Sequence, residues 1–186
     1  DLFELINRSE SLSTNEKIFC PNFHAKALSH QLLKVFKKEI VAVEKAKMTR
    51  FRDLRFVANV LHKVYGYRMD SLTDVRTTDR SITTKDITKF AKEIHKCAVD
   101  NHHKDGTLFD DTIMKKMGID KAYACVVSVV KALGKVYRRI PYSKKWELSC
   151  IRDSLMMFTY LNATNRLTTS QIDEHRPVIF DILNEY

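Results

Sequence analysis

The chain has 186 residues and carries 32 Lys and Arg against 23 Asp and Glu, which gives a formal net charge of +9. Apolar residues make up 44% and charged residues 30%, with only four Gly and three Pro. This composition excludes disordered, collagen-like and low-complexity architectures, and no apolar run approaches the roughly 18 residues that span a bilayer. Length and composition predict one compact domain over residues 1–186, in which residues 1–20 either join the core or form a peripheral N-terminal segment.

Two amphipathic helices are predicted in the first third of the chain. After Pro21, apolar residues recur every three or four positions and predict a helix over 23–47. The same spacing predicts a second helix over 49–65. Gly66 would end it, because glycine adopts the left-handed conformation that follows many helices. The polar stretch 67–82 is expected to be a long connection.

Local signals also mark the next two helices. Thr83 with Asp86 three residues later resembles a capping box, which predicts a helix that continues through Ala98. A turn at Asp105-Gly106 separates it from a short helix that ends at Gly118.

The most hydrophobic element covers approximately residues 121–138, with Asp120 as its expected cap. The β-branched run Val126–Val130 is also compatible with a buried strand, but the chain offers no second strand to pair with it. We therefore predict a central helix that is buried by its neighbours, with only a narrow polar edge.

Two further helical segments follow. Ser143 is expected to cap a helix that runs through Leu161, and Thr168 with Gln171 forms a second capping-box pattern. Pro177 would either start or kink the terminal helix. The whole pattern predicts an all-α helical bundle of seven or eight helices around the central one.

The positive charge is concentrated in two blocks. Residues 24–68 contain eleven Lys and Arg against three acidic residues, for a net +8, and residues 121–152 contain eight against one, for a net +7. The rest of the chain sums to −6. Like charges at helical spacing repel each other slightly, and a polyanion would offset that repulsion. Alternatively, the charge serves only solubility.

The blocks place basic residues on single helix faces, with aromatic residues at their edges that could stack on unpaired bases. The predicted nucleic-acid-binding residues are Lys34, Lys37, Lys38, Arg52, Arg55, Lys63, Lys131, Lys135, Arg138, Arg139, Lys144 and Lys145, with Tyr137 and Tyr142 as stacking rings.

No catalytic or metal signature stands out. The sequence contains no nucleophile motif and no Gly-rich phosphate-binding loop, so we expect a protein that is not an enzyme and has no cofactor. Two groups of potential zinc ligands, Cys20 with His24 and His95 with Cys97, His102 and His103, fit no zinc-finger spacing, and we expect no metal.

We interpret the chain as a non-enzymatic, intracellular (cytoplasmic or nuclear) nucleic-acid-binding protein, nucleoprotein-like, with RNA favoured and with self-association. The alternative is a helical protein–protein interaction module, intracellular or secreted like a cytokine, whose basic faces bind an acidic partner. In a secreted protein the glycosylation sequons at Asn7 and Asn162 and the pairing of the four cysteines would become relevant.

Overall fold

The computed structural model describes residues 12–40, 43, 51–69, 82–138 and 148–185. Within these residues the chain forms nine helices and no strand, so the predicted all-α class is confirmed. The helices are α2 (Thr14–Phe19), α3 (Phe23–Glu39), α5 (Arg52–Met69), α7 (Thr84–Asp100), α8 (Asp111–Lys116), α9 (Asp120–Tyr137), α10 (Leu148–Ala163), α11 (Thr169–Glu174) and α12 (Arg176–Glu185).

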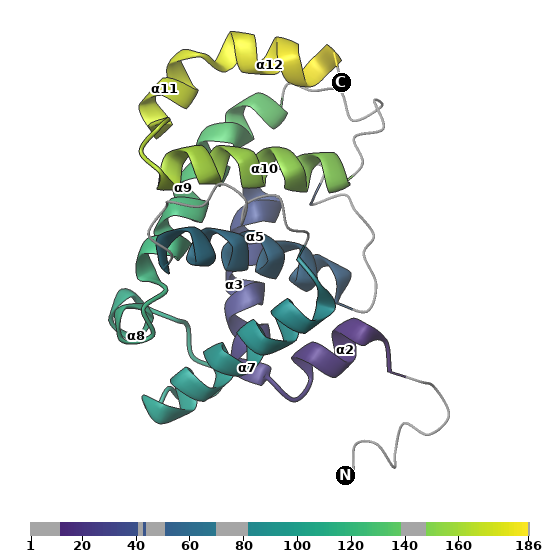
Figure 1. The fold of residues 1–186 in the computed structure, drawn as a ribbon, viewed down its shortest axis with the longest axis vertical. Coiled ribbons are helices and arrows are strands. Elements are labelled where there is room, and N and C mark those ends of the chain that lie inside the picture. The colour runs from purple at the N-terminus through teal and green to yellow at the C-terminus, as the bar shows by residue number, and fades with distance from the viewer. Residues whose placement is uncertain (1–11, 41–42, 44–50, 70–81, 139–147, 186) are drawn as a thin grey trace.

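Helix α9 holds the bundle together, as its hydrophobic sequence predicts. It contacts α3, α5, α8, α10, α11 and α12. Helices α11 and α12 lie at one end of the molecule, and α2 and α7 lie at the other (Figure 1). The exposed positions of α9 form one narrow line along the helix: Lys121, Ala124, Ser128, Lys131, Lys135 and Arg138.

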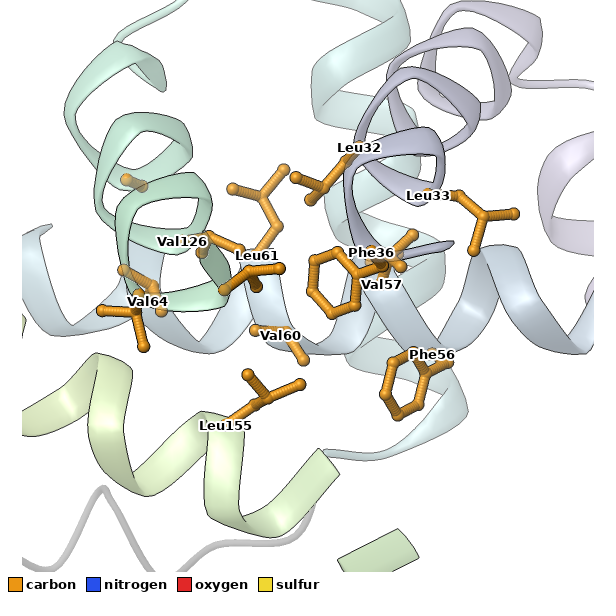
Figure 2. Close-up of a cluster of buried hydrophobic side chains, with 14 of the residues drawn as sticks. Leu32, Leu33, Phe36, Phe56, Val57, Val60, Leu61, Val64, Val126 and Leu155 are labelled. Atoms are coloured by element: carbon orange, nitrogen blue, oxygen red, sulfur yellow. The ribbon is translucent and has the colours of Figure 1, made fainter. Parts of the chain in front are cut away.

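The core is formed where α3, α5, α9 and α10 meet. Figure 2 shows Phe36 from α3, Val57 from α5, Val126 from α9 and Leu155 from α10 in this cluster, and none of these side chains has measurable exposure. The ring of Phe36 also packs edge-on against Phe56. Full burial of each such side chain contributes about 1.5–3 kcal/mol.

Helix starts follow local capping signals. Thr83 with Asp86 and Thr168 with Gln171 form the predicted capping boxes, with both reciprocal hydrogen bonds present. Helix α2 was not predicted, although Ser13 with Glu16 three residues later is a capping-box pattern that the sequence contains. That signal satisfies two backbone donors at the start of even a short helix.

Two predicted helix ends are wrong. Helix α3 ends at Glu39 rather than at residue 47, because Ile40 adopts an extended conformation, with φ −120° and ψ 101°, and buries its side chain. Helix α5 continues through Gly66 to Met69. An interior glycine costs a helix only about 1 kcal/mol relative to alanine, so it does not by itself impose an end.

The later helices differ from prediction in smaller ways. Asp120 is the first residue of α9, and Ile119 takes the cap position without a side-chain hydrogen bond. Pro177 lies in the first turn of α12, where its missing N–H would have no partner in the helix. The proline therefore starts a separate helix. The predicted cap Ser143 and the predicted start of the second helix at residue 49 lie outside the described residues.

Candidate nucleic-acid interface

The two basic blocks meet where the last turns of α3 and α9 cross. Gly134 of α9 lies against Glu39 of α3, so closely that a Cβ atom at position 134 would stand 2.9 Å from both the Cβ and the carbonyl oxygen of Glu39. Real Cβ atoms essentially never approach so closely. Only glycine permits this crossing.

Arg138 links the two helix ends. Its Nη2 donates to the backbone carbonyl of Lys38 at 3.0 Å and to Oε2 of Glu39 at 3.1 Å. The last carbonyl groups of a helix have no partner within the helix, so the guanidinium satisfies one of them and places its positive charge at the negative end of the α3 dipole. The second basic block is thereby joined to the first.

Three further cations lie at exposed positions of the two helices. Lys34 and Lys38 lie four residues apart on the exposed side of α3, and Lys131 lies seven residues before Arg138, on nearly the same side of α9 and about 10 Å along its axis. Lys34, Lys38 and Lys131 form no ion pair within the described part of the chain. We call Lys34, Lys38, Lys131 and Arg138 the junction surface.

Two of the predicted lysines are paired with carboxylates. Nζ of Lys37 lies 3.6 Å from Oδ2 of Asp53, and Nζ of Lys135 lies 3.0 Å from Oδ1 of Asp173 in α11. Both lysine side chains remain about half exposed. Exposed pairs of this kind contribute only about 0–1 kcal/mol, so a phosphate could replace the carboxylate at little cost.

The predicted stripe on α5 does not form one open face. Arg55 donates to Oδ1 of Asn15 at 3.3 Å and to Oγ1 of Thr84 at 2.9 Å, so it bridges α2 and α7. Arg52 is exposed at the start of α5, whereas Lys63 is half-buried. The described contacts therefore give Arg55 a structural role.

Tyr137 does not present its ring to a ligand. The side chain is only 6% exposed, and its hydroxyl is hydrogen-bonded to Ser154 of α10. Burial raises the pKa of the phenol well above its usual range, and the Ser154 hydrogen bond opposes this rise. The ring belongs to the core, so it has no open face for a base. The other predicted residues, Arg139, Tyr142, Lys144 and Lys145, lie outside the described residues.

Sequence reasoning overlooked a line of four exposed lysines on α7, Lys85, Lys89, Lys92 and Lys96. Their spacing of four, three and four residues puts them on one helix face. The zero net charge of residues 69–100 concealed them, although helical spacing alone would have found them. Lys89 is paired with Glu93 at 3.8 Å. These lysines form a second basic face, separate from the junction surface.

The fold also brings together three histidines, of which one is far from the other two in the sequence. His24 of α3 lies with its ring centroid 5.2 Å from that of His95 in α7 and 5.5 Å from that of His103 in the segment 101–110. Among the described residues, no group of three or more His, Cys, Asp or Glu side chains is arranged to hold a metal ion.

No protein-family model, no curated protein and no solved structure matches this chain. None of the helices in the described residues is both long and apolar enough to cross a membrane. The fold and the distribution of charge are therefore the observations that bear on function.

Proposed function

We propose that this protein binds nucleic acid without catalysing a reaction, that single-stranded RNA is its preferred ligand, and that the junction surface is its principal contact. The observation that carries the proposal is the Arg138 contact with Lys38 and Glu39, because it brings cations from both basic blocks together. Self-association and an intracellular location belong to the same proposal.

The expected binding is electrostatic. Exposed lysines and arginines that neutralise phosphates release counterions, which gives affinity that falls steeply with salt and depends little on sequence. Tyr137 is buried, so base stacking has no support from the predicted tyrosine within the described residues. We therefore expect phosphate contacts to dominate and sequence preference to be weak.

The test is a charge-reversal variant, Lys34→Glu with Lys38→Glu and Lys131→Glu. These three side chains are exposed and form no ion pair within the described part of the chain, so the fold should survive. Arg138 and Lys135 are left unchanged because both also join helices. A matched control, Lys85→Glu with Lys92→Glu and Lys96→Glu on α7, makes the same change in net charge elsewhere.

Binding to a fluorescent single-stranded RNA would be measured by anisotropy over a range of salt concentrations, with circular dichroism as the check on folding. We expect the junction variant to lose affinity by at least about tenfold and its salt slope to flatten by about 2, which corresponds to three lost phosphate contacts. The α7 control should keep most of its affinity. Equal losses in both variants would show that only net charge matters, and an unchanged junction variant would refute the assignment.

The alternative, a protein–protein interaction module, is favoured by one observation on α12. Val178 and Ile182 lie four residues apart and are each 56% exposed, which is unusual for large apolar side chains on the same face. The secreted version has less support, because the amide of Asn162 donates to the carbonyl of Leu167 at 2.9 Å and so is engaged within the fold. The ratio of absorbance at 260 and 280 nm of freshly purified protein separates the two functions, since only a nucleic-acid-binding protein would carry RNA through purification.

A further inference from the structure

The three histidines His24, His95 and His103, together called the histidine cluster, lie among phenylalanine rings. The ring of Phe23 lies 4.3 Å from that of His24 and 4.6 Å from that of His95, and Phe109 lies 4.2 Å from His103, measured between centroids. The cluster thus joins three parts of the chain: the start of α3, the second half of α7 and the segment 101–110.

This environment favours a neutral His24. The side chain is 3% exposed and lies in the first turn of α3, where the positive end of the helix dipole disfavours an added proton. Burial lowers the pKa of His24, as do the neighbouring His95 and His103, and the carboxylate of Asp105 acts in the opposite direction. Among the described residues, these are the groups whose charge acts on His24.

The other two histidines have few hydrogen-bond partners. Nδ1 of His95 is buried and has no hydrogen-bond partner in the described part of the chain. Nε2 of His103 lies 3.4 Å from Oγ1 of Thr107, a long contact with a neutral hydroxyl. A proton on His24 in the closed cluster would lie beside two further imidazoles, and the Asp105 carboxylate is the group that compensates its charge.

We infer that the histidine cluster is a pH-sensitive latch, which holds the segment 101–110 against α3 and α7 at neutral pH and releases it as the pH falls below about 6.5. Because the folded-state pKa of His24 is lowered, the open state binds more protons than the closed state over this range. The stability of the closed state is therefore highest above the unperturbed pKa of histidine, and it decreases as the pH falls below that value. This inference does not depend on nucleic-acid binding.

Hydrogen exchange reports on the latch locally. Three backbone N–H groups mark the closed state: His102 donates to the carbonyl of Val99, His103 to that of Ala98, and Phe109 to Oε1 of Gln31. Protection factors for residues 101–110, corrected for the intrinsic pH dependence of exchange, would be measured at about pH 7.5 and about pH 5. We expect the protection of residues 101–110 to fall at the lower pH, because the open state binds more protons than the closed state.

Variants identify the responsible group. His24→Phe keeps an aromatic ring without a titratable nitrogen and should abolish the pH response of residues 101–110. The matched control is His62→Phe, because burial also lowers the pKa of His62, yet its ring packs on Phe90 of α7 outside the cluster. The control should keep the response.

A second variant guards against failure of His24→Phe to fold. His103→Gln removes one of the two histidines that lower the pKa of His24 and should reduce the response without abolishing it. Constant protection of residues 101–110 in the unmodified protein between the two pH values would overturn the latch. A full response in folded His24→Phe, or an unreduced response in His103→Gln, would overturn it as well.

Discussion

Gln31 of α3 hydrogen-bonds both backbone groups of Phe109, which lies 78 residues further along the chain. Its Nε2 donates to the Phe109 carbonyl at 2.9 Å, and its Oε1 accepts from the Phe109 N–H at 2.9 Å. The side-chain amide thus satisfies the backbone acceptor and donor of Phe109, as a neighbouring β-strand satisfies those of an edge strand. A connection with little regular structure of its own obtains a defined position from one residue of a helix.

Replacing Gln31 by Leu should destabilise the protein by about 1–3 kcal/mol, because it leaves both polar groups of Phe109 without their partner. Urea denaturation followed by circular dichroism would measure the loss. Gln31→Glu provides the comparison, since it keeps the acceptor for the Phe109 N–H and removes the donor to its carbonyl. A Leu variant as stable as the unmodified protein would show that the hydrogen bonds between Gln31 and Phe109 do not contribute to stability.

The sequence predicted helix starts better than helix ends, for a physical reason. The capping boxes at Thr83 and Thr168 involve side chains only three residues from their backbone partners. The end of α3 at Glu39 is stabilised instead by Arg138, which is about a hundred residues away in the chain. No local pattern contains that information.

The capping box of Thr83 can be tested directly. Its Oγ1 accepts from the Asp86 N–H at 3.2 Å, while its own N–H donates to Oδ2 of Asp86 at 2.9 Å. Thr83→Ala should lower the free energy of unfolding by about 1 kcal/mol, with a range of 0.5–2 kcal/mol. Thr88→Ala in the same helix is the control. Its hydroxyl donates only to the carbonyl of Thr84, so its loss should leave stability equal or slightly higher. Equal losses in the two variants would argue against a special role for the cap.

The candidate site was only partly predictable. Helical spacing correctly placed Lys34, Lys38 and Lys131 on exposed positions. It could not show that Tyr137 lies under α10 or that Lys135 is paired with Asp173 in α11, because both partners come from segments whose position depends on the packed core. Spacing within one helix gives exposure; contacts between helices decide which exposed charges are already neutralised.

Because α3 and α9 cross at Gly134, a methyl group added at this position should change the stability of the protein. Alanine favours a helix over glycine by about 1 kcal/mol, but its Cβ would overlap the backbone of Glu39, and overpacking typically costs about 1–3 kcal/mol. Gly134→Ala should therefore reduce stability by up to about 2 kcal/mol net, measured by urea denaturation. Ser128→Ala, on the exposed line of the same helix, should be neutral or slightly stabilising. A gain in stability for Gly134→Ala would mean that α3 does not rest on this residue.

His30 lies on α3 four residues before Lys34, so its titration can report on bound phosphate. Burial lowers the pKa of His30, as do the charges of Lys26, Lys37 and Lys34, while Asp53 acts in the opposite direction. A phosphate near Lys34 would offset the lysine charges, so RNA binding should raise this pKa. Since the bound state then holds more protons, affinity should increase as the pH falls from about 7.5 to about 6.

Nuclear magnetic resonance of the histidine Cε1–H groups would follow this titration with and without a saturating single-stranded RNA, and His30→Gln would assign the signal. His62, whose ring packs on Phe90 of α7 and whose pKa is lowered by burial, is the internal control and should titrate identically in both states. Saturation with RNA without a change in the His30 titration would place the nucleic acid on another face of the molecule. The four-lysine face of α7 would then be the next surface to test, because it is the other line of exposed lysines at helical spacing among the residues described.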